Sequence, residues 1–594
     1  MNISFLKGIS AVSAPKIQNN HTQIKTKDMP SDTFVRTSSA VKESVCEENF
    51  NPETAAEELR QIKNFKGVPK FDEEKIATLV GLVSEQPEKW QAVKTIVQEP
   101  KMISTLVMDF ASRDAETLNA VADLTVLKKE NGEPRFTPLN IKNMANQLEG
   151  HQLAKIGVLS QMPIDSDEII AIAKNDKITD TAKVVQKVNK FAKENPDARR
   201  ISFVQDEFDE NAYNVRIDLP DNGSKILLLD KNLEERAIEE VKIEKSKEGY
   251  PQQVKYTTDY KNNTTSKVVS MKSPSLPQPI VTEETRVVRN AQGQVLRTEQ
   301  YGLSDLAGTP NIKYVYPDGT EKIISEGKYD ENTGETTVFK DMVSTDGTRT
   351  QYQYAEDADG NVHSSYKITD KSGKVLLDKN ITFEVVDENT CISTEKDKKY
   401  EIKFAENSIN VTNMNTGEVS VLELDGKIDG NKEKLMKSFR HMPAEEIIAL
   451  GQTTDNFNGI ENTNESTYSA VTRTIKSGDN LFVVLHEAGH AKDYANVDVK
   501  QKETLLNSIF SNPEVNKVFE EEKAAFNKAF PLAQRDHISY FIKTSEYKDG
   551  IQEAIAETNA ILNTKNSEEL FEIRSHYLQQ YFPKTIAYLA TIMD

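Results

Sequence analysis

The sequence predicts a multidomain protein in which an N-terminal all-α helical array is followed by a central antiparallel β-meander and a C-terminal α+β domain. Three observations support this order. The chain has 594 residues, too many for one hydrophobic core. Its apolar residues recur with a helical period up to about residue 200, alternate with a period of two from Ile201, and return to the helical period after Asp429. Glycine-containing turn motifs are frequent between Ile201 and Asp429.

The N-terminal region is expected to contain a disordered leader and then helices. Residues 1–45 are rich in Ser, Thr, Lys and Asn without any apolar period, which is typical of segments that do not fold. In residues 46–200 the apolar side chains recur at helical spacing, as in Ile76, Leu79 and Val83. A stacked array of helices is the simplest account of this pattern.

The middle of the chain is expected to form antiparallel strands joined by tight turns. Turn glycines provide the positive φ angles of such turns, and four of them are equally spaced along the chain: Gly334, Gly347, Gly360 and Gly373. This spacing leaves room for strands of about nine residues. We expect the proline-rich stretch 274–282 to be a linker that separates a β-rich region, 201–273, from the regular meander, 283–428.

The C-terminal domain is predicted to span residues 429–594, where the helical period restarts with Leu435 and Phe439. Because this stretch has its own helix-capping residues, we expect a fragment that begins near Asp429 to fold alone. The segment Thr467–Ile475 is rich in β-forming residues and is expected to be an edge strand. An extended peptide could pair with such a strand through backbone hydrogen bonds.

The strongest chemical signal lies in this domain, in the run His486-Glu487-Ala488-Gly489-His490. Positions i and i+4 of a helix lie one turn apart on the same face, so His486 and His490 can bind one metal ion while Glu487 points to its open side. The preceding apolar run, 481–485, and the potential capping residues Asp479 and Asn480 favour a buried helix here.

A second helical segment provides two carboxylates four residues apart, Glu553 and Glu557, which share one helix face. Glu553 can be the third metal ligand, and Glu557 can hold a ligand imidazole in its binding orientation. Two histidines and one glutamate leave the fourth position of a tetrahedral zinc ion for water. The pattern therefore predicts a catalytic Zn²⁺ site.

The chemistry expected of such a site requires a base and an oxyanion donor. Glu487 is the carboxylate that helix geometry fixes beside the metal, so it is the predicted general base. A second hydrogen-bond donor is needed for the oxygen that becomes negative in the transition state. Tyr547 is the first candidate for this role, and failing that His537 or Tyr540.

Three segments of the C-terminal domain, HEAGHAKDYA, QEAIAETNAIL and FPKTIAYLATIM, resemble gluzincin zinc metallopeptidases of the anthrax lethal factor family. This resemblance covers the region 429–594 and implies a zincin-like fold there. It implies that the zinc ligands are His486, His490 and Glu553, that the base is Glu487, and that Glu557 and Asp493 support the ligands. The family places its oxyanion tyrosine seven residues before the glutamate ligand, at Glu546 here. Tyr547 lies one residue later.

Composition limits the partners and the compartment. The net charge of −20, the pI near 5.1 and the absence of a strong basic run in the sequence argue against a nucleic-acid partner, and protein or peptide substrates are expected instead. No apolar stretch of the sequence approaches the roughly 20 residues that cross a bilayer. The two cysteines, Cys46 and Cys391, give no disulfide framework. The first residues do not resemble a signal peptide, since Lys7 interrupts their apolar run, so both the cytoplasm and export by a signal-independent route stay open.

Two functions agree with these features. One is a zinc-dependent endopeptidase whose upstream domains recognise or deliver it to a target. The other is a binding or scaffold protein that carries a relic of a zincin domain. A relic usually lacks the base or a ligand, whereas Glu487 and all three predicted ligands are present, so the sequence favours the enzyme.

Overall fold

The structure is a computed structural model. It describes residues 50–128, 132–209, 211–247, 249–271, 280–302, 309–460, 466–529, 535, 537–542, 550–564 and 572–593. The predicted leader 1–45, most of the predicted linker 274–282, and Tyr547 lie outside these residues. The chain divides into two compact units, Met1–Trp90 and Gln91–Asp594.

In the first unit the structure describes residues 50–90, which form two helices, α1 (Pro52–Gln61) and α2 (Glu73–Glu85), and the 3-10 turn η3 (Pro87–Lys89). The side chain of Asn51 accepts hydrogen bonds from the first turn of α1, and Asp72 does the same for α2, as expected for these residue types. Leu79 and Val83 of α2 are fully buried. The helix with one buried face that their spacing predicts is therefore confirmed.

Seven further helices occur among the described residues of the helical region and pack successively along the chain, α5 against α6 and α7, and α7 against α8 and α9. They end at Glu194, so the predicted change of structure near residue 201 is confirmed. Their bounds are α3 (Trp90–Val97), α4 (Ser104–Ala111), α5 (Ala115–Val126), α6 (Pro138–Gln147), α7 (Gly150–Leu159), α8 (Ser166–Lys174) and α9 (Thr181–Glu194).

The centre of the second unit is one large antiparallel sheet, with eighteen strands among the described residues. Each strand pairs with the strands that precede and follow it in the chain. The predicted meander is thus confirmed. The strands are β1 (Arg200–Gln205), β2 (Tyr213–Asp218), β3 (Ser224–Leu229), β4 (Glu235–Lys245), β5 (Pro251–Asp259), β6 (Thr264–Met271), β7 (Ile280–Arg289), β8 (Val295–Gly302), β9 (Asn311–Val315), β10 (Glu321–Asp330), β11 (Glu335–Val343), β12 (Arg349–Glu356), β13 (Val362–Thr369), β14 (Val375–Asp387), β15 (Thr390–Glu395), β16 (Lys398–Phe404), β17 (Ser408–Asn413) and β18 (Val419–Glu423).

The four equally spaced glycines lie in the turns between β10 and β14. Gly334, Gly347, Gly360 and Gly373 have φ angles of 71°, 88°, 83° and 88°. Left-handed φ values of this kind are accessible to glycine at little cost. The prediction of tight turns at these positions is confirmed.

The predicted β regions 201–273 and 283–428 contribute strands to the same sheet. β6 pairs with β7 from Thr264, opposite Val288, to Met271, opposite Ile280, so the sheet continues across the proline-rich stretch. The last residues of the predicted linker already belong to β7.

The C-terminal region, from Ile428 onwards, contains a small mixed sheet and several helices. The sheet has the order β19-β20-β22-β21, with strands β19 (Ile428–Gly430), β20 (Asn456–Gly459), β21 (Thr467–Ser469) and β22 (Thr474–Ser477). The helices are α10 (Lys432–Phe439), α11 (Ala444–Thr453), α12 (Leu481–Asp493), the 3-10 turn η5 (Lys502–Asn507), α13 (Pro513–Ala529), α15 (Ser539–Ile542), α16 (Gly550–Asn563), α17 (Glu572–Tyr581) and α18 (Pro583–Met593).

The segment Thr467–Ile475 is not a single strand but forms most of the hairpin β21–β22. Ser469 pairs with Thr474, and Arg473 in the turn has a φ of 47°, which ends the extended conformation. β21 nevertheless is the outer strand of the small sheet. The prediction of an edge strand is correct for its first three residues.

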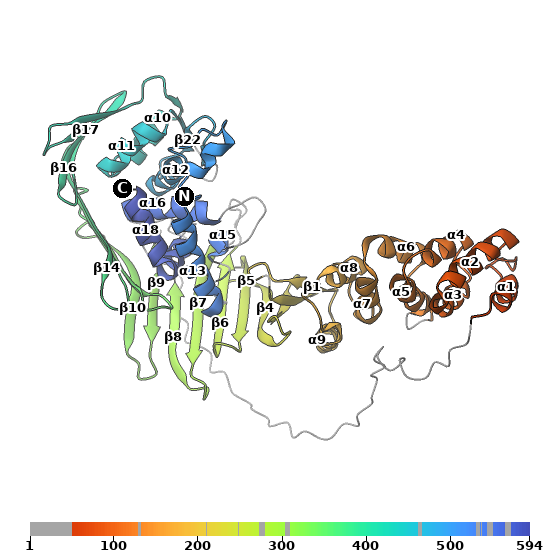
Figure 1. Ribbon diagram of the computed structural model, residues 1–594. Helices are drawn as coiled ribbons and strands as arrows, with labels where there is room; N and C mark the ends of the chain where they lie inside the picture. Colours follow the sequence, from red (N-terminus) through yellow and green to blue (C-terminus); the bar gives the residue numbers. More distant parts are fainter. Residues whose placement is uncertain are drawn as a thin grey trace. The chain divides into compact units, whose positions relative to one another are not determined.

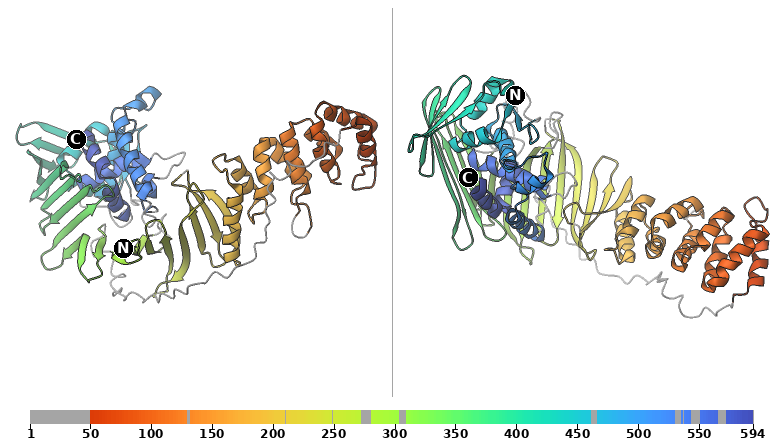
Figure 2. Two further views of the ribbon diagram at one scale, coloured as in Figure 1. Left: turned by 60° about the horizontal axis from the view of Figure 1, so that its bottom comes forward. Right: turned by 45° about the horizontal axis from the view of Figure 1, so that its top comes forward.

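The C-terminal helices cover the inner face of the large sheet, which curves around them (Figures 1 and 2). On β12 the buried residues alternate with exposed ones, as expected when one face is covered and the other is wet. The inner residues contact the C-terminal region directly, since Thr350 donates a hydrogen bond to the carbonyl of Gln579 in α17 and Tyr352 to that of Thr564, the residue after α16.

One hydrophobic core joins the strands and the C-terminal helices. It extends from Val338 and Tyr366 of the sheet to Leu485 of α12 and Ile555 of α16. Removal of the sheet would expose the apolar surface that these helices bury. The expectation that a fragment beginning at Asp429 folds alone is therefore at odds with the packing.

Candidate metal centre

Helix α12 carries the histidine motif as predicted. The side chain of Asn480 accepts a hydrogen bond of 3.1 Å from the backbone N–H of Val483, so Asn480 is the N-cap. Residues 482–485 of the apolar run that follows are buried. His486 and His490 lie on one helix face with their ring centroids 5.1 Å apart.

Helix α16 carries Glu553 and packs closely against α12. Gly489 makes this approach possible because a Cβ atom at this position would lie only 2.6 Å from the Cα atom of Ala556. The residues of α16 beyond Glu553 are almost all buried, which fixes this helix in the core. Gly489 therefore brings Glu553 to the face of α12 that holds the two histidines.

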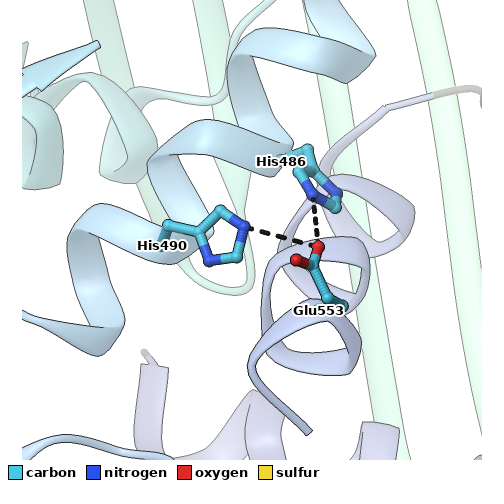
Figure 3. A group of neighbouring side chains, drawn as sticks. All are labelled: His486, His490 and Glu553. Carbon is cyan, nitrogen blue, oxygen red and sulfur yellow. Dashed lines mark ion pairs between the residues drawn. The ribbon is translucent and has the colours of Figure 1, made fainter. Parts of the chain in front are cut away.

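His486, His490 and Glu553 lie close enough to bind a metal ion (Figure 3). The Nε2 atoms of the two histidines lie 3.4 Å and 3.6 Å from Oε2 of Glu553. Zinc–ligand bonds of about 2.0–2.1 Å in tetrahedral geometry separate two ligands by about 3.4 Å. The observed separations fit this value, and within the described part of the chain this group is the one with metal-binding geometry.

The three side chains are only partly buried. Their exposed fractions are 12% for His486, 18% for His490 and 16% for Glu553. A structural zinc site is closed by four protein ligands, whereas a catalytic site keeps one position for water or substrate. Three ligands with some contact to solvent match the second arrangement.

The electrostatics of the site favour a cation. Burial alone raises the pKa of a carboxyl group, but the two imidazoles outweigh it and hold the pKa of Glu553 far below its usual range. Burial lowers the pKa of His486, yet the carboxylates of Glu553 and Glu557 outweigh burial and raise this pKa to about 9. The same carboxylates that favour a proton here would favour a divalent metal.

Glu557 lies behind His486, as its spacing predicts. Its Oε2 atom is 3.2 Å from Nδ1 of His486, and its side chain is fully buried. It accepts a hydrogen bond of 2.7 Å from Nη2 of Arg574 and another from the hydroxyl of Ser575. Burial opposes its charge, but Arg574 and His486 lower the pKa of Glu557 to about 2. A carboxylate in this position can fix the orientation of a metal-binding imidazole.

Glu487 follows His486 on α12 and is 7% exposed. Burial raises its pKa, while a hydrogen bond from the backbone N–H of Tyr468 works in the opposite direction. Tyr468 belongs to β21, the outer strand of the small sheet. The predicted base therefore lies next to the strand that was expected to bind an extended peptide.

The three candidate oxyanion donors have different surroundings. Tyr547 lies outside the described residues. The hydroxyl of Tyr540 donates a hydrogen bond to Oε2 of Glu553, which places Tyr540 at the metal centre. His537 lies 3.1 Å from Glu284 of β7 and stacks on Tyr577, so its ring is engaged with the large sheet and α17.

Asp493 lies at the end of α12 and is almost fully buried. Its Oδ1 atom accepts a hydrogen bond of 2.9 Å from the backbone N–H of Phe510. This contact fixes the chain after the motif helix. The support of a zinc ligand by Asp493 stays a prediction.

A buried polar network lies on the other side of α12 and α16. Lys492 pairs with Glu446 of α11 and donates a hydrogen bond of 3.1 Å to Asn559. Glu446 accepts hydrogen bonds from Asn559 and Asn563 at 3.1 and 3.0 Å. Lys379 of β14 donates a 2.9 Å hydrogen bond to Asn563. The network therefore ties both ligand-bearing helices to each other and to the large sheet.

Sequence reasoning missed Arg574 and the network residues. Arg574 lies in a different helix from the residues it contacts, and no periodicity links it to Glu557. Lys379 is even more distant along the chain. Two neighbouring carboxylates in a buried helix, Glu553 and Glu557, indicate that a cationic side chain must lie nearby to balance their charge. The sequence does not indicate which arginine or lysine that is.

Comparisons with known protein families and with curated proteins find no match for this chain. Among the described residues, no helix is both long and apolar enough to cross a membrane.

Proposed function

We propose that this protein is a zinc-dependent endopeptidase of the gluzincin type, related to the lethal factor family through its C-terminal region. The observation that supports this most is the convergence of His486, His490 and Glu553 at tetrahedral separations, with Glu487 on the same helix. These three side chains would hold the zinc ion. The donor set of two imidazoles and one carboxylate is one that catalytic zinc sites use.

The bound zinc would polarise the carbonyl of the peptide bond and make a water molecule more acidic. Glu487 takes a proton from the attacking water on its carboxylate and passes it to the nitrogen of the leaving amine. Its raised pKa, caused by burial, suits a group that must both accept and release a proton. Tyr540 is the oxyanion donor that we favour: its hydroxyl donates to Glu553 before substrate binds and would turn from Glu553 to the carbonyl oxygen of the substrate in the transition state.

The substrate is a polypeptide in extended conformation. β21 is the outer strand of the small sheet, and its residue Tyr468 contacts Glu487 through the backbone. A peptide that pairs with this edge strand through backbone hydrogen bonds would hold its backbone in a fixed position relative to Glu487. We assign target recognition or delivery to the helical region and the large sheet.

A binding or scaffold protein with a relic site is the competing function. A relic has no need to keep a buried base, three converging ligands and a carboxylate behind one of them. The retention of Glu487 and Glu557, both of which are costly to bury without a role, favours the enzyme.

The test is the cleavage of a peptide library by the purified full-length protein. We expect cleavage that stops after metal removal and returns with Zn²⁺. Glu487→Gln should bind the metal as before and lose hydrolysis by several orders of magnitude, because no carboxylate then accepts the proton of water. A zinc-loaded protein that cleaves no peptide of the library, or a fully active Glu487→Gln variant, would refute the proposal.

A further inference from the structure

Arg574 of α17 lies between two residues that touch the metal ligands. Its Nη2 atom is 2.7 Å from Oε2 of Glu557. Its guanidinium carbon lies 4.3 Å from the ring centre of Tyr540. The side chain is 14% exposed, so these contacts are largely shielded from water and salt.

Both residues that Arg574 contacts, Glu557 and Tyr540, in turn contact a predicted metal ligand. Glu557 lies 3.2 Å from Nδ1 of His486, and Tyr540 donates its hydroxyl hydrogen to Glu553. One guanidinium is therefore connected to an imidazole ligand on α12 and to the carboxylate ligand on α16. These connections join four helices around the site, since Tyr540 lies on α15 and Arg574 on α17.

We propose that Arg574 is a positioning residue that sets the orientation of His486 and Glu553 for metal binding. This inference rests on the proposed zinc site. The planar guanidinium can bind a carboxylate with its edge and stack on an aromatic ring with its face. Lysine can supply the charge but cannot hold both neighbours in this way.

If Arg574 had a purely structural role, its loss would lower folding stability without altering metal binding. Another arginine of the chain provides a matched control for this case. Arg297 of β8 lies 2.7 Å from Oε1 of Glu299 and 4.9 Å from the ring centre of Tyr314. It thus combines an ion pair with a tyrosine contact, but in the large sheet. Loss of Arg297 should affect folding stability without altering the metal ligands.

The experiment compares the full-length wild type with Arg574→Met, Arg574→Lys and Arg297→Met. The affinity for Zn²⁺ is measured by competition with a chromogenic chelator, and ligand geometry by the visible absorption of the Co²⁺-loaded proteins. Urea unfolding of the metal-free proteins reports stability. We expect Arg574→Met to bind Zn²⁺ about ten to a hundred times more weakly, the usual effect of losing a group that orients ligands.

Arg574→Lys should also bind Zn²⁺ more weakly than the wild type, and both variants should show an altered Co²⁺ spectrum. Arg297→Met should keep the wild-type affinity and spectrum. Wild-type affinity in Arg574→Met, full recovery in Arg574→Lys, or equal weakening in Arg297→Met would each overturn the inference. If Arg574→Met does not fold, Arg574→Lys decides. A wild type that binds no Zn²⁺ would refute the proposed function itself, which is a distinguishable result.

Discussion

Gly489 offers a sensitive test of the contact between the two ligand-bearing helices. In the substitution Gly489→Ala, the new methyl carbon would meet the Cα atom of Ala556 at 2.6 Å, its carbonyl oxygen at 3.0 Å and the Cβ atom of Asn559 at 3.0 Å. The closest of these atoms belong to the backbone, so no side-chain rotation can relieve the clash. The helices α12 and α16 must therefore move apart.

The required movement is large compared with the tolerance of a metal site. Carbon atoms pack best at about 3.5–4.0 Å, so the helices must separate locally by about 1 Å. Metal–ligand distances vary by only about 0.2 Å between well-formed sites. Overpacking of this kind usually costs about 1–3 kcal/mol of folding free energy. We expect Gly489→Ala to lose this much stability and to bind Zn²⁺ at least about a hundred times more weakly, a loss of about 2.8 kcal/mol.

Urea unfolding and zinc competition titrations measure these two effects. Gly451→Ala in α11 is the matched control, because its methyl group would meet its nearest neighbours at 3.8 and 3.9 Å, an ordinary contact distance. This control should be neutral or more stable by up to about 1 kcal/mol, since alanine favours a helix over glycine. If Gly489→Ala matched the wild type in both stability and zinc affinity, the close packing of α12 and α16 would be wrong.

Three further predictions concern the oxyanion donor, the polar network and the shared core. Tyr540→Phe should lower kcat by about a hundredfold with little change in KM; steady-state kinetics with an unchanged kcat would exclude Tyr540 as the donor. Lys379→Met removes the hydrogen bond to the buried Asn563 and should cost about 1–3 kcal/mol of unfolding free energy; urea denaturation indistinguishable from that of the wild type would contradict this role. The fragment 429–594 should fail to unfold cooperatively, because the sheet provides part of its core; a soluble, zinc-binding fragment in circular dichroism and metal assays would show that the helices fold without the sheet.

The features that could be predicted from the sequence are local ones. The i, i+4 spacing of His486 and His490 fixes their common face in any helix, and Asn480 caps that helix through its own side chain. The pair Glu553 and Glu557 follows the same rule on α16. The equal spacing of the turn glycines likewise depends on a few neighbouring residues. Each pattern acts within one or two helical turns or one hairpin, so a single sequence displays it.

The features that escaped prediction depend on contacts between distant segments. Nothing in the proline-rich stretch indicates that β6 and β7 pair across it. Burial of Leu485 against the sheet and the position of Arg574 beside Glu557 arise only when the helices pack. The segment after Ser469 reads as a strand by composition, although a turn at Arg473 divides it. The composition of one segment does not indicate which distant segment it will contact.

The zinc content of the purified full-length protein tests the central claim most directly. Elemental analysis should find one zinc per chain in the wild type and none in His490→Ala, because the remaining imidazole and carboxylate cannot hold the ion through purification. Circular dichroism of the same samples should show that the variant is folded. Stoichiometric zinc in a folded His490→Ala protein would contradict the assignment of His486, His490 and Glu553 as the metal centre.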